Sequence, residues 1–352
     1  MTGGTRRLRL DRVASAARHA GIDRDVIVAE EIVSRPGYVI AARILNDKSV
    51  YNVLEDPSGR MVPLRAGHLV AGVLGNRQAL RGYAGEVPSR LAVGDRVNVL
   101  NLGGVLGRCT AISPDLGPPF EAEVLGAVLS FPPLGDRVGR PARVADGAPA
   151  APSDLHCRAP LVLVAGTSMD SGKTVAAGEL VHGLTAAGFR VAAAKLTGVA
   201  LRRDALAMLD AGAVMALTFD DAGVVSTDDR AALPAARAVL THLDREARPD
   251  VIVAELGDGL LGAYGVGTIL GAPDIRALVR ALVTCAPDPV AAWGADRLLR
   301  EAWGLRPTVV TGPATDNAVG RDAIRARLGV PAWNARRQPG ELVAAVREAL
   351  DG

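Results

Sequence analysis

The chain has 352 residues, of which 49% are hydrophobic and 22% charged, a composition typical of a globular protein and not of a disordered one. Its formal net charge at pH 7 is only +2, which gives no strong electrostatic field for gathering nucleic acid or an anionic membrane. Three cysteines without CxxC spacing argue against a disulfide framework, and five scattered histidines argue against a structural zinc site.

The chain has no run of 18 apolar residues, and its basic N-terminal stretch lacks the apolar core of a signal peptide. We therefore predict a cytoplasmic protein that binds neither nucleic acid nor membrane. The length exceeds that of one average domain and predicts two.

The N-terminal part predicts a tail followed by a β-rich domain. Residues 1–24 form a basic tail with a short helix candidate at 12–20. Residues 25–131 contain short β-rich runs broken by glycine, proline and aspartate, and such runs at close spacing predict a small barrel or sandwich. These runs are 26–33, 38–45, 68–74, 95–102 and 120–129.

The C-terminal part predicts an α/β domain. Residues 132–160 are rich in proline, glycine and alanine with little periodicity, which indicates a linker. From 161 to 352 apolar runs alternate with helical patterns, and this alternation predicts a mostly parallel sheet covered on both faces by helices.

The most informative motif follows the apolar run 161–165. The sequence GTSMDSGKT at 166–174 is a phosphate-cradling loop, or Walker A motif, between a buried strand and a helix. Its glycines let backbone amides turn inward, its lysine reaches the β- and γ-phosphates, and its final threonine offers a hydroxyl to magnesium. The predicted nucleotide-binding residues are Gly166, Thr167, Asp170, Ser171, Gly172, Lys173 and Thr174.

Lysine is rare in this chain. Only Lys48, Lys173 and Lys195 are lysines among 40 basic residues. A compact ammonium approaches phosphate or carboxylate oxygens as a point charge, which a planar guanidinium does not copy. We therefore assign Lys173 and Lys195 catalytic roles.

The stretch GTSMDSGKTVAAGELVHGLTAAGFRVAAAKLTG at 166–198 resembles the opening of dethiobiotin synthetase, a P-loop enzyme of the SIMIBI type. The second lysine of that family holds the carbamate or carboxylate that becomes phosphorylated, and Lys195 matches its spacing of 22 residues from Lys173. The resemblance therefore implies that Lys195 is the substrate-side cation. It also implies a homodimer.

The same resemblance implies magnesium ligands. Asp204 matches an aspartate in an Asp-Ala-Leu segment of the family, and Glu255, at the end of VIVAEL, matches a glutamate at the end of a buried strand. With Thr174 they supply the carboxylates and hydroxyl that a hard dication bridging phosphates prefers. Asp204 can instead be a carboxylate favoured by a helix N-terminus, and Glu255 can instead be structural.

The sequence departs from the family on the substrate side. Met169 and Asp170 replace a threonine and a glutamate in the loop, Val199 replaces a substrate-side serine, and Asp258 interrupts a glycine run. Met169, Lys195 and Asp258 are the candidate substrate contacts, although Asp258 can equally be a turn residue. The polar stretch 219–227 either lines the substrate site or forms an ordinary turn.

The phosphate loop predicts nucleotide handling, and the resemblance implies an enzyme that uses ATP and Mg²⁺ to phosphorylate a small-molecule carboxylate or carbamate for attack by an amine, as a ligase or cyclo-ligase. ATP is favoured over GTP because no Asn-Lys-x-Asp signature occurs. The alternative is a nucleotide-switched adaptor or chaperone whose β-rich domain contacts a partner of cofactor assembly or metabolism.

Overall fold

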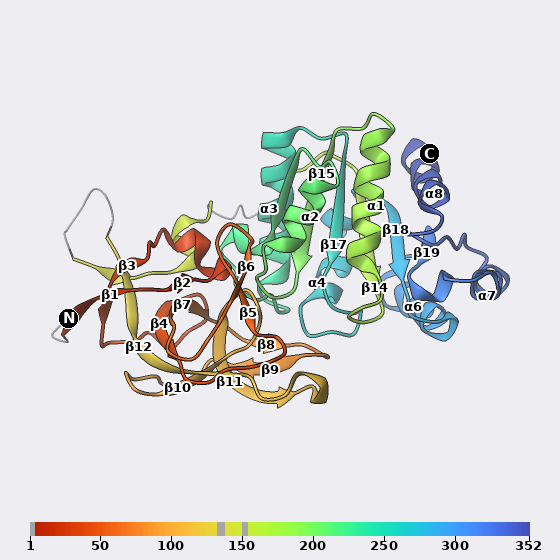
Figure 1. The fold of residues 1–352 in the computed structure, drawn as a ribbon. Helices are drawn as coiled ribbons and strands as arrows, with labels where there is room; N and C mark the ends of the chain where they lie inside the picture. The colour runs from red at the N-terminus through yellow and green to blue at the C-terminus, as the bar shows by residue number, and fades with distance from the viewer. Residues whose placement is uncertain (1–3, 132–137, 150–153) are drawn as a thin grey trace. The chain divides into compact units, whose positions relative to one another are not determined.

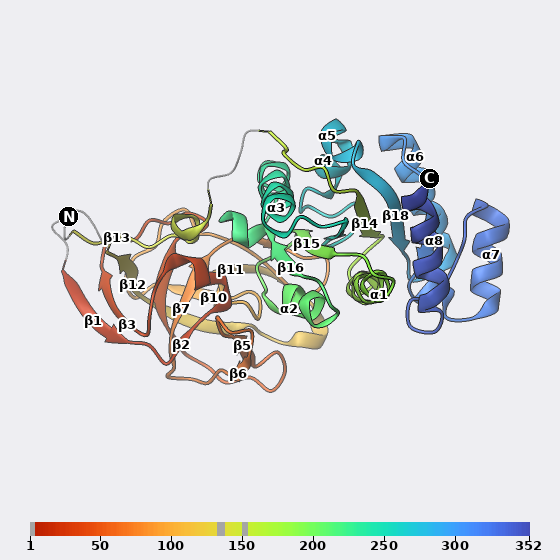
Figure 2. The same cartoon turned by 90° about the horizontal axis from the view of Figure 1, so that it is seen from above.

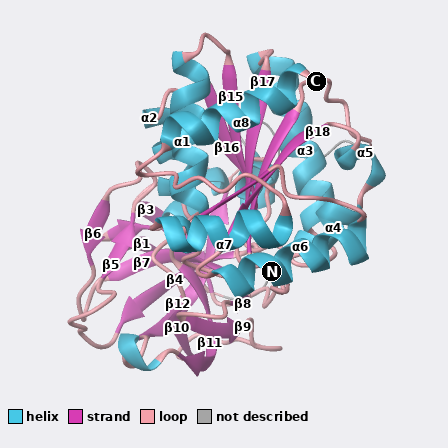
Figure 3. Ribbon diagram, turned by 90° about the vertical axis from the view of Figure 1, so that its right-hand side faces the viewer, coloured by secondary structure: helices cyan, strands magenta, loops and turns pink. Residues whose placement is uncertain are grey.

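The computed structural model describes residues 4–131, 138–149 and 154–352. It divides into two compact units. The first comprises Met1–Pro149 together with Val199–Arg203 and Asp220–Ser226, and the second comprises Ala150–Gly198, Asp204–Phe219 and Thr227–Gly352. Figure 3 shows that strands dominate the first unit, whereas helices flank the strands of the second.

Five strands of the first unit close into a small barrel. They pair in the ring β12 to β4 to β7 to β11 to β10 and back to β12. Their bounds are β4 Val39–Ile44, β7 Leu69–Leu74, β10 Arg96–Val99, β11 Val105–Ile112 and β12 Phe120–Ser130. Alternate residues of these strands enter two apolar clusters, one on each face. The β-rich domain expected from the sequence is therefore a barrel and not a sandwich.

Shorter elements complete the first unit. The strands are β1 Thr5–Arg9, β2 Arg12–Val13, β3 Asp25–Ala29, β5 Val53–Glu55, β6 Met61–Pro63, β8 Arg77–Gln78, β9 Tyr83–Glu86 and β13 Arg140–Pro141. The 3₁₀ helices are η1 Ser15–Ala20, η2 Pro114–Leu116 and η3 Val144–Gly147. Strands β5 and β6 pair with each other as a hairpin.

The structure corrects the expected tail at 1–24. β1 pairs antiparallel with β3 and β2 pairs parallel with β7, so among the described residues this segment extends the sheet. The helix expected at 12–20 starts as strand β2 and ends as the 3₁₀ helix η1. Exposed arginines in β1 hid its strand character, because an edge strand buries little apolar surface.

The expected linker at 132–160 is also corrected in part. Residues 132–137 and 150–153 lie outside the described residues. Between them, β13 pairs with β12, and Ala142 and Val144 are fully buried in a core cluster of the first unit. Their burial makes this stretch part of the first unit.

The second unit contains a six-stranded parallel sheet in the order β16-β15-β17-β14-β18-β19 (Figure 1). The strands are β14 Leu161–Gly166, β15 Val191–Thr197, β16 Met215–Thr218, β17 Val251–Leu256, β18 Val279–Cys285 and β19 Val309–Thr311. This arrangement confirms the α/β fold class. The carboxyl ends of all six strands meet at one edge, where open α/β sheets bind ligands.

Helices cover both faces of this sheet. Helix α1 packs on β14, β15 and β17, whereas α3 packs on β15 and β16 from the opposite side (Figure 2). The helices are α1 Lys173–Ala186, α2 Arg203–Asp210, α3 Ala232–Ala247, α4 Val266–Gly271, α5 Pro273–Arg276, α6 Pro289–Trp303, α7 Ala318–Leu328 and α8 Pro339–Asp351. Two 3₁₀ helices, η4 Phe219–Ala222 and η5 Pro313–Thr315, lie between them.

Among the described residues, no helix combines the length and the apolar character that crossing a membrane requires.

Candidate nucleotide-binding site

The loop at 166–172 joins the central strand β14 to helix α1, as its sequence predicts. The ammonium of Lys173 donates to the Ser168 carbonyl at 2.7 Å, so the lysine side chain folds back over its own loop. A Cβ on Gly166 would lie 2.3 Å from the Ser171 hydroxyl, so only glycine allows the loop to curl this tightly. The second unit therefore has the strand, loop and helix of a P-loop NTPase.

Lys195 and Glu255 are neighbours in the sheet. They lie opposite each other in the register of β15 and β17. Each continues the row of side chains, including Val191 and Val253, that packs in the core cluster beneath α1, so both face the side of the sheet that α1 covers. Glu255 accepts a hydrogen bond from the Thr174 hydroxyl at 3.1 Å. The packing of α1 on the sheet thus brings Thr174 to Glu255, which lies 81 positions further along the chain.

Asp204 joins this group through an ion pair. The Lys195 ammonium donates to the Asp204 carboxylate, and the two side chains are only 15% and 10% exposed. Asp204 lies in the first turn of α2, directly after the segment that follows β15. The carboxyl edge of the sheet therefore holds one ammonium that is paired with Asp204 and that belongs to the residue opposite Glu255 in the register.

The loop after β17 lies against the phosphate loop. The Leu260 amide donates to the Gly166 carbonyl at 3.0 Å. A Cβ on Gly259 would lie 2.5 Å from the Thr167 carbonyl oxygen, so the two backbones are in direct contact. The sequence analysis missed this contact, although the pair of glycines at 257 and 259 is a signal for a close backbone approach.

Asp258, in the same loop, is the most unusual polar residue of the site. It is 9% exposed, and no hydrogen bond of good geometry reaches either carboxylate oxygen among the described residues, although the nearby Gly259 amide counteracts part of the rise in the Asp258 pKa. Its backbone is left-handed, with φ of 69°, a region that aspartate tolerates better than most residues. Buried polar groups without partners are costly, so Asp258 marks a place where a ligand with hydrogen-bond donors fits.

Burial and charge act in opposite directions on the ionisable groups. Burial raises the pKa of Glu255, and the positive charges of Lys195 and Lys173 counteract that rise. Burial lowers the pKa of Lys173, and Glu255 opposes this effect. Burial also raises the pKa of Asp258, with Lys173 acting in the opposite direction. The site is therefore a desolvated cluster of both signs, as functional sites often are.

The donor set suits a hard dication. The second carboxylate oxygen of Glu255 is buried without a hydrogen-bond partner among the described residues, while the first holds the Thr174 hydroxyl. One carboxylate and one hydroxyl beside a phosphate loop are the ligands with which Mg²⁺ bound to phosphates is held. The part of the chain that the structure describes contains no group of three or more His, Cys, Asp or Glu side chains that could hold a metal.

The remaining predicted residues are placed as follows. Ser171 is buried, Met169 is half-buried, and Asp170 is exposed with a left-handed φ of 59°. The hydroxyl of Thr167 is buried without a partner among the described residues. The structure places Asp220–Ser226, most of the polar stretch expected at 219–227, in the first unit, where Arg18 binds Asp220 and Asp221.

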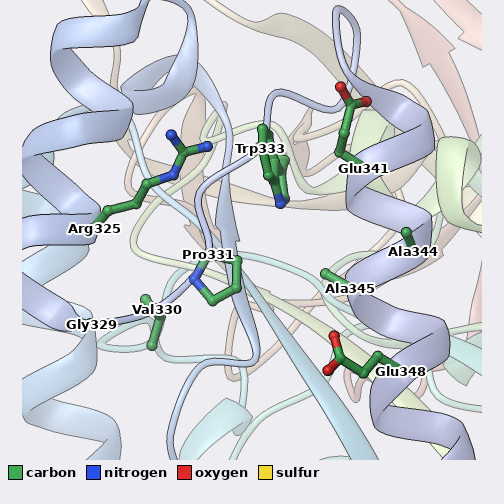
Figure 4. Close-up of a pocket in the computed structure, with 9 residues that line it drawn as sticks. All are labelled: Arg325, Gly329, Val330, Pro331, Trp333, Glu341, Ala344, Ala345 and Glu348. Carbon is green, nitrogen blue, oxygen red and sulfur yellow. The ribbon is translucent and has the colours of Figure 1, made fainter.

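A separate hollow of about 530 Å³ lies between the end of α7 and the helix α8. Figure 4 shows Trp333 standing between Arg325 and Glu341, and the Arg325 guanidinium lies 4.3 Å from the centre of the Trp333 ring. None of the predicted site residues lines this hollow. A second hollow, of about 480 Å³, begins at Thr174 and follows α1 to His182.

No protein-family model and no curated protein matches the chain. Among solved structures, it is similar to a DUF1611 family protein from Anabaena variabilis, with 18% identity over 56% of this chain and 62% of that chain and a TM-score of 0.36. The chain therefore spans less than two thirds of that protein's length.

Two further structures are similar to a comparable extent. Chloroplast FtsY from Physcomitrella patens has 14% identity over 58% of this chain and 70% of its own, with a TM-score of 0.39. The hydrogenase maturation factor HypB from Archaeoglobus fulgidus has 13% identity over 55% and 90%, with a TM-score of 0.36. The P-loop NTPase fold of the second unit follows from its own strand order and loop.

Proposed function

We propose that this chain uses ATP and Mg²⁺ to phosphorylate a carboxylate or carbamate of a small molecule. The substrate oxygen attacks the γ-phosphorus and ADP leaves; an amine then attacks the carbonyl carbon of the acyl phosphate, releasing phosphate and a proton. The observation that carries the proposal is the register of Lys195 opposite Glu255, with Thr174 bonded to Glu255. It supports an acceptor cation and a metal ligand side by side at the phosphate loop.

Each residue has a role in this proposal. Lys173 neutralises charge that develops between the β- and γ-phosphates, and Thr174 and Glu255 hold the metal. Bound there, Mg²⁺ would supply charge neutralisation on the phosphate oxygens. Lys195 holds the acceptor. Its ion pair with Asp204 supports that role, because it shows that the Lys195 ammonium binds a carboxylate group at this position. Asp204 then either moves to the metal or orients the lysine.

The direct test measures ADP formation by the full chain with Mg²⁺, ATP and a panel of small carboxylates and amines. Hydroxylamine in place of the amine traps an acyl phosphate as a hydroxamate. We expect ADP formation to depend on one class of carboxylate and hydroxamate to accumulate with it. Turnover that no small acid or carbamate stimulates would contradict the proposal.

A nucleotide-switched adaptor is the second candidate, and one observation favours it. The segments that follow β15 and β16, Val199–Arg203 and Asp220–Ser226, belong to the first unit, so the ends of these strands are connected to that unit along the chain. Slow basal hydrolysis that a protein partner accelerates, with no response to small acids, would support the switch. GTP in place of ATP is tested in the same assay.

A further inference from the structure

The first unit holds the beginning of α2 through a buried carboxylate. Glu55, the last residue of β5, is completely buried. Its two carboxylate oxygens accept hydrogen bonds from the backbone amides of Arg202 and Arg203, each at 2.7 Å. The hydroxyl of Ser15 donates to the same carboxylate. Glu55 therefore satisfies amides that the first turn of α2 leaves without helical partners.

The hairpin that carries Glu55 is itself fixed. The Glu55 amide donates to the Leu102 carbonyl at 2.7 Å, and Leu54 is buried in the core of the first unit. The Arg202 side chain donates to the Pro57 carbonyl in the same hairpin. Glu55 is thus a rigid anchor, since both its backbone and its carboxylate are bonded.

The segment between β15 and α2 is held at a second point. The Ala200 carbonyl accepts a hydrogen bond from the Asn101 amide group at 2.8 Å, and the Ala200 amide donates to the Val225 carbonyl at 2.8 Å. Asn101 is 5% exposed and its own oxygen accepts from the Val105 amide. The first unit therefore fixes both ends of Val199–Arg203.

This segment joins the two members of the ion pair described above. Lys195 lies at the end of β15, four residues before Val199, and Asp204 follows Arg203 directly. The position of Asp204 relative to Lys195 thus depends on where α2 begins. Asp204 orients the Lys195 ammonium through their ion pair. Glu55, which binds the amides of Arg202 and Arg203, therefore influences the position of the ammonium without contacting it.

We infer that Glu55 is a positioning residue for the Lys195–Asp204 pair, acting along the chain through the backbone of Arg203, which precedes Asp204. The expected effect of Glu55 on turnover rests on the proposed function. The expected effect of Glu55 on the position of Lys195 does not depend on that function. The Glu55 carboxylate itself bonds to Ser15 and to the amides of Arg202 and Arg203, none of which belongs to the phosphate loop, so we expect its loss to affect nucleotide binding less than it affects the lysine.

The test compares Glu55→Gln with a matched change, Glu86→Gln, in the full chain. Glutamine keeps the volume of Glu55 but has one acceptor oxygen, so at most one of the two amides keeps its bond. Glu86 is an exposed carboxylate of the same unit, paired with Arg108. We expect Glu55→Gln to lower turnover at saturating nucleotide about tenfold, since small misplacement of a charged group is costly, and to change nucleotide affinity less than about twofold. Glu86→Gln should change neither.

A second readout needs no activity. Lysine labelled with ¹³C at Cε gives three signals, from Lys48, Lys173 and Lys195, which Lys48→Arg and Lys195→Arg assign. Glu55→Gln should shift the Lys195 signal and leave the Lys48 signal in place, whereas Glu86→Gln should shift neither. An unmoved Lys195 signal together with unchanged turnover overturns the inference.

The outcomes separate this inference from the proposed function. A wild-type chain that binds no nucleotide refutes the proposed function, while the Lys195 signal still decides the role of Glu55. If the wild-type chain turns over ATP and the Glu55→Gln variant turns it over equally well, only the role of Glu55 is refuted. If Glu55→Gln does not fold, Ser15→Ala removes one donor to the same carboxylate and should shift the Lys195 signal with a turnover loss of about two- to threefold; no shift there overturns the inference.

Discussion

At the scale of single residues, the chain separates lysine from arginine by task. Two of its three lysines lie at the phosphate loop and near the end of β15, the next strand along the chain, while arginines supply nearly all other positive charge. The Lys195 ammonium is paired with Asp204, and a Cβ on Gly257 would lie 3.1 Å from the Lys195 Cε, so the lysine side chain runs close to the backbone that follows β17. A planar guanidinium does not copy the compact ammonium in its contact with a carboxylate.

We therefore predict that Lys195→Arg lowers carboxylate-dependent turnover about a hundredfold and leaves nucleotide affinity nearly unchanged. Charge is conserved, so the loss would come from the shape of the guanidinium. Steady-state ADP release and calorimetric nucleotide titration measure the two effects. The matched control is Lys48→Arg, a lysine of the first unit that donates to the Leu116 carbonyl at 3.1 Å and should tolerate the change. Wild-type turnover in Lys195→Arg would remove the role of Lys195.

Asp258 offers a prediction about stability. A buried carboxylate without partners destabilises the folded state, so Asp258→Asn should raise the free energy of unfolding at pH 7 by about 1 kcal/mol. Asparagine also tolerates the left-handed backbone, so the substitution adds no backbone strain. Turnover should fall at the same time, because the group lies at the phosphate loop.

The pH dependence of the stability gain tests whether the buried charge of Asp258 causes it. Burial raises the pKa of Asp258 in the folded state, so the wild-type chain gains stability from this group as the pH falls and loses it as the pH rises. The advantage of Asp258→Asn should therefore shrink as the pH is lowered toward the folded-state pKa. Urea unfolding from neutral pH down to about pH 4, the ordinary pKa of aspartate, measures it, and an advantage that is constant over this whole range would contradict this account.

At the scale of elements, the loop after β17 contacts the phosphate loop. Glu255 is the last residue but one of β17, and four residues later Gly259 lies against the Thr167 carbonyl. Neither backbone can shift without moving the other. A change at this contact is therefore expected to act on nucleotide binding and not on the core.

Gly259→Ala tests this coupling. The added methyl would lie 2.5 Å from the Thr167 carbonyl oxygen and 3.0 Å from the Ser168 Cα, both backbone atoms, so one loop must move. We predict at least about a tenfold loss of nucleotide affinity, equivalent to about 1.4 kcal/mol. Gly178→Ala is the control, because a methyl there meets nothing within 4 Å and should stabilise α1 by about 0.5–1 kcal/mol without altering affinity. Equal affinity in both variants would contradict the coupling.

The elements also show what the sequence can predict. The apolar runs at 38–45 and 68–74 and the alternation beyond 161 correspond to observed strands and helices, because burial on a sheet imposes a period that sequence displays. The apolar pattern of the sequence does not reveal the order of the strands in the sheet. Lys195 lies opposite Glu255 because β15 pairs with β17, and these two strands are far apart in the chain. The resemblance to dethiobiotin synthetase pointed to both residues, but their contact required the sheet.

Other elements escaped prediction for physical reasons. β1 is an exposed edge strand rich in arginine, and the β5–β6 hairpin pairs only within itself among the described strands, so neither has a strong apolar pattern. The role of Glu55 had no signal in sequence, since a glutamate in a short polar run is usually solvated. Its partners are backbone amides of residues 202 and 203, which have no side-chain signature.

At the scale of the whole molecule, the chain is not a simple series of two domains. Val199–Arg203 and Asp220–Ser226 leave the second unit and return to it, and between them they place Ala200 and Val225 in a core cluster of the first unit. The boundary expected at 132–160 is therefore only one of several crossings. Ala200 and Val225, which belong to the first unit's core, are encoded 40 and 65 residues after the end of that boundary.

This interleaving predicts that the C-terminal part does not fold alone. A fragment of residues 154–352 would expose Ala200 and Val225, which are 0% and 3% exposed in the full chain, and would leave Asp220 without Arg18. We expect this fragment to lose cooperative thermal unfolding and to aggregate, because exposed apolar surface and an unpaired carboxylate both destabilise it. Co-expression with residues 1–149 should restore a soluble complex, which serves as the control. A fragment that stays monomeric, unfolds cooperatively and binds nucleotide like the full chain would show that the two segments do not depend on the first unit.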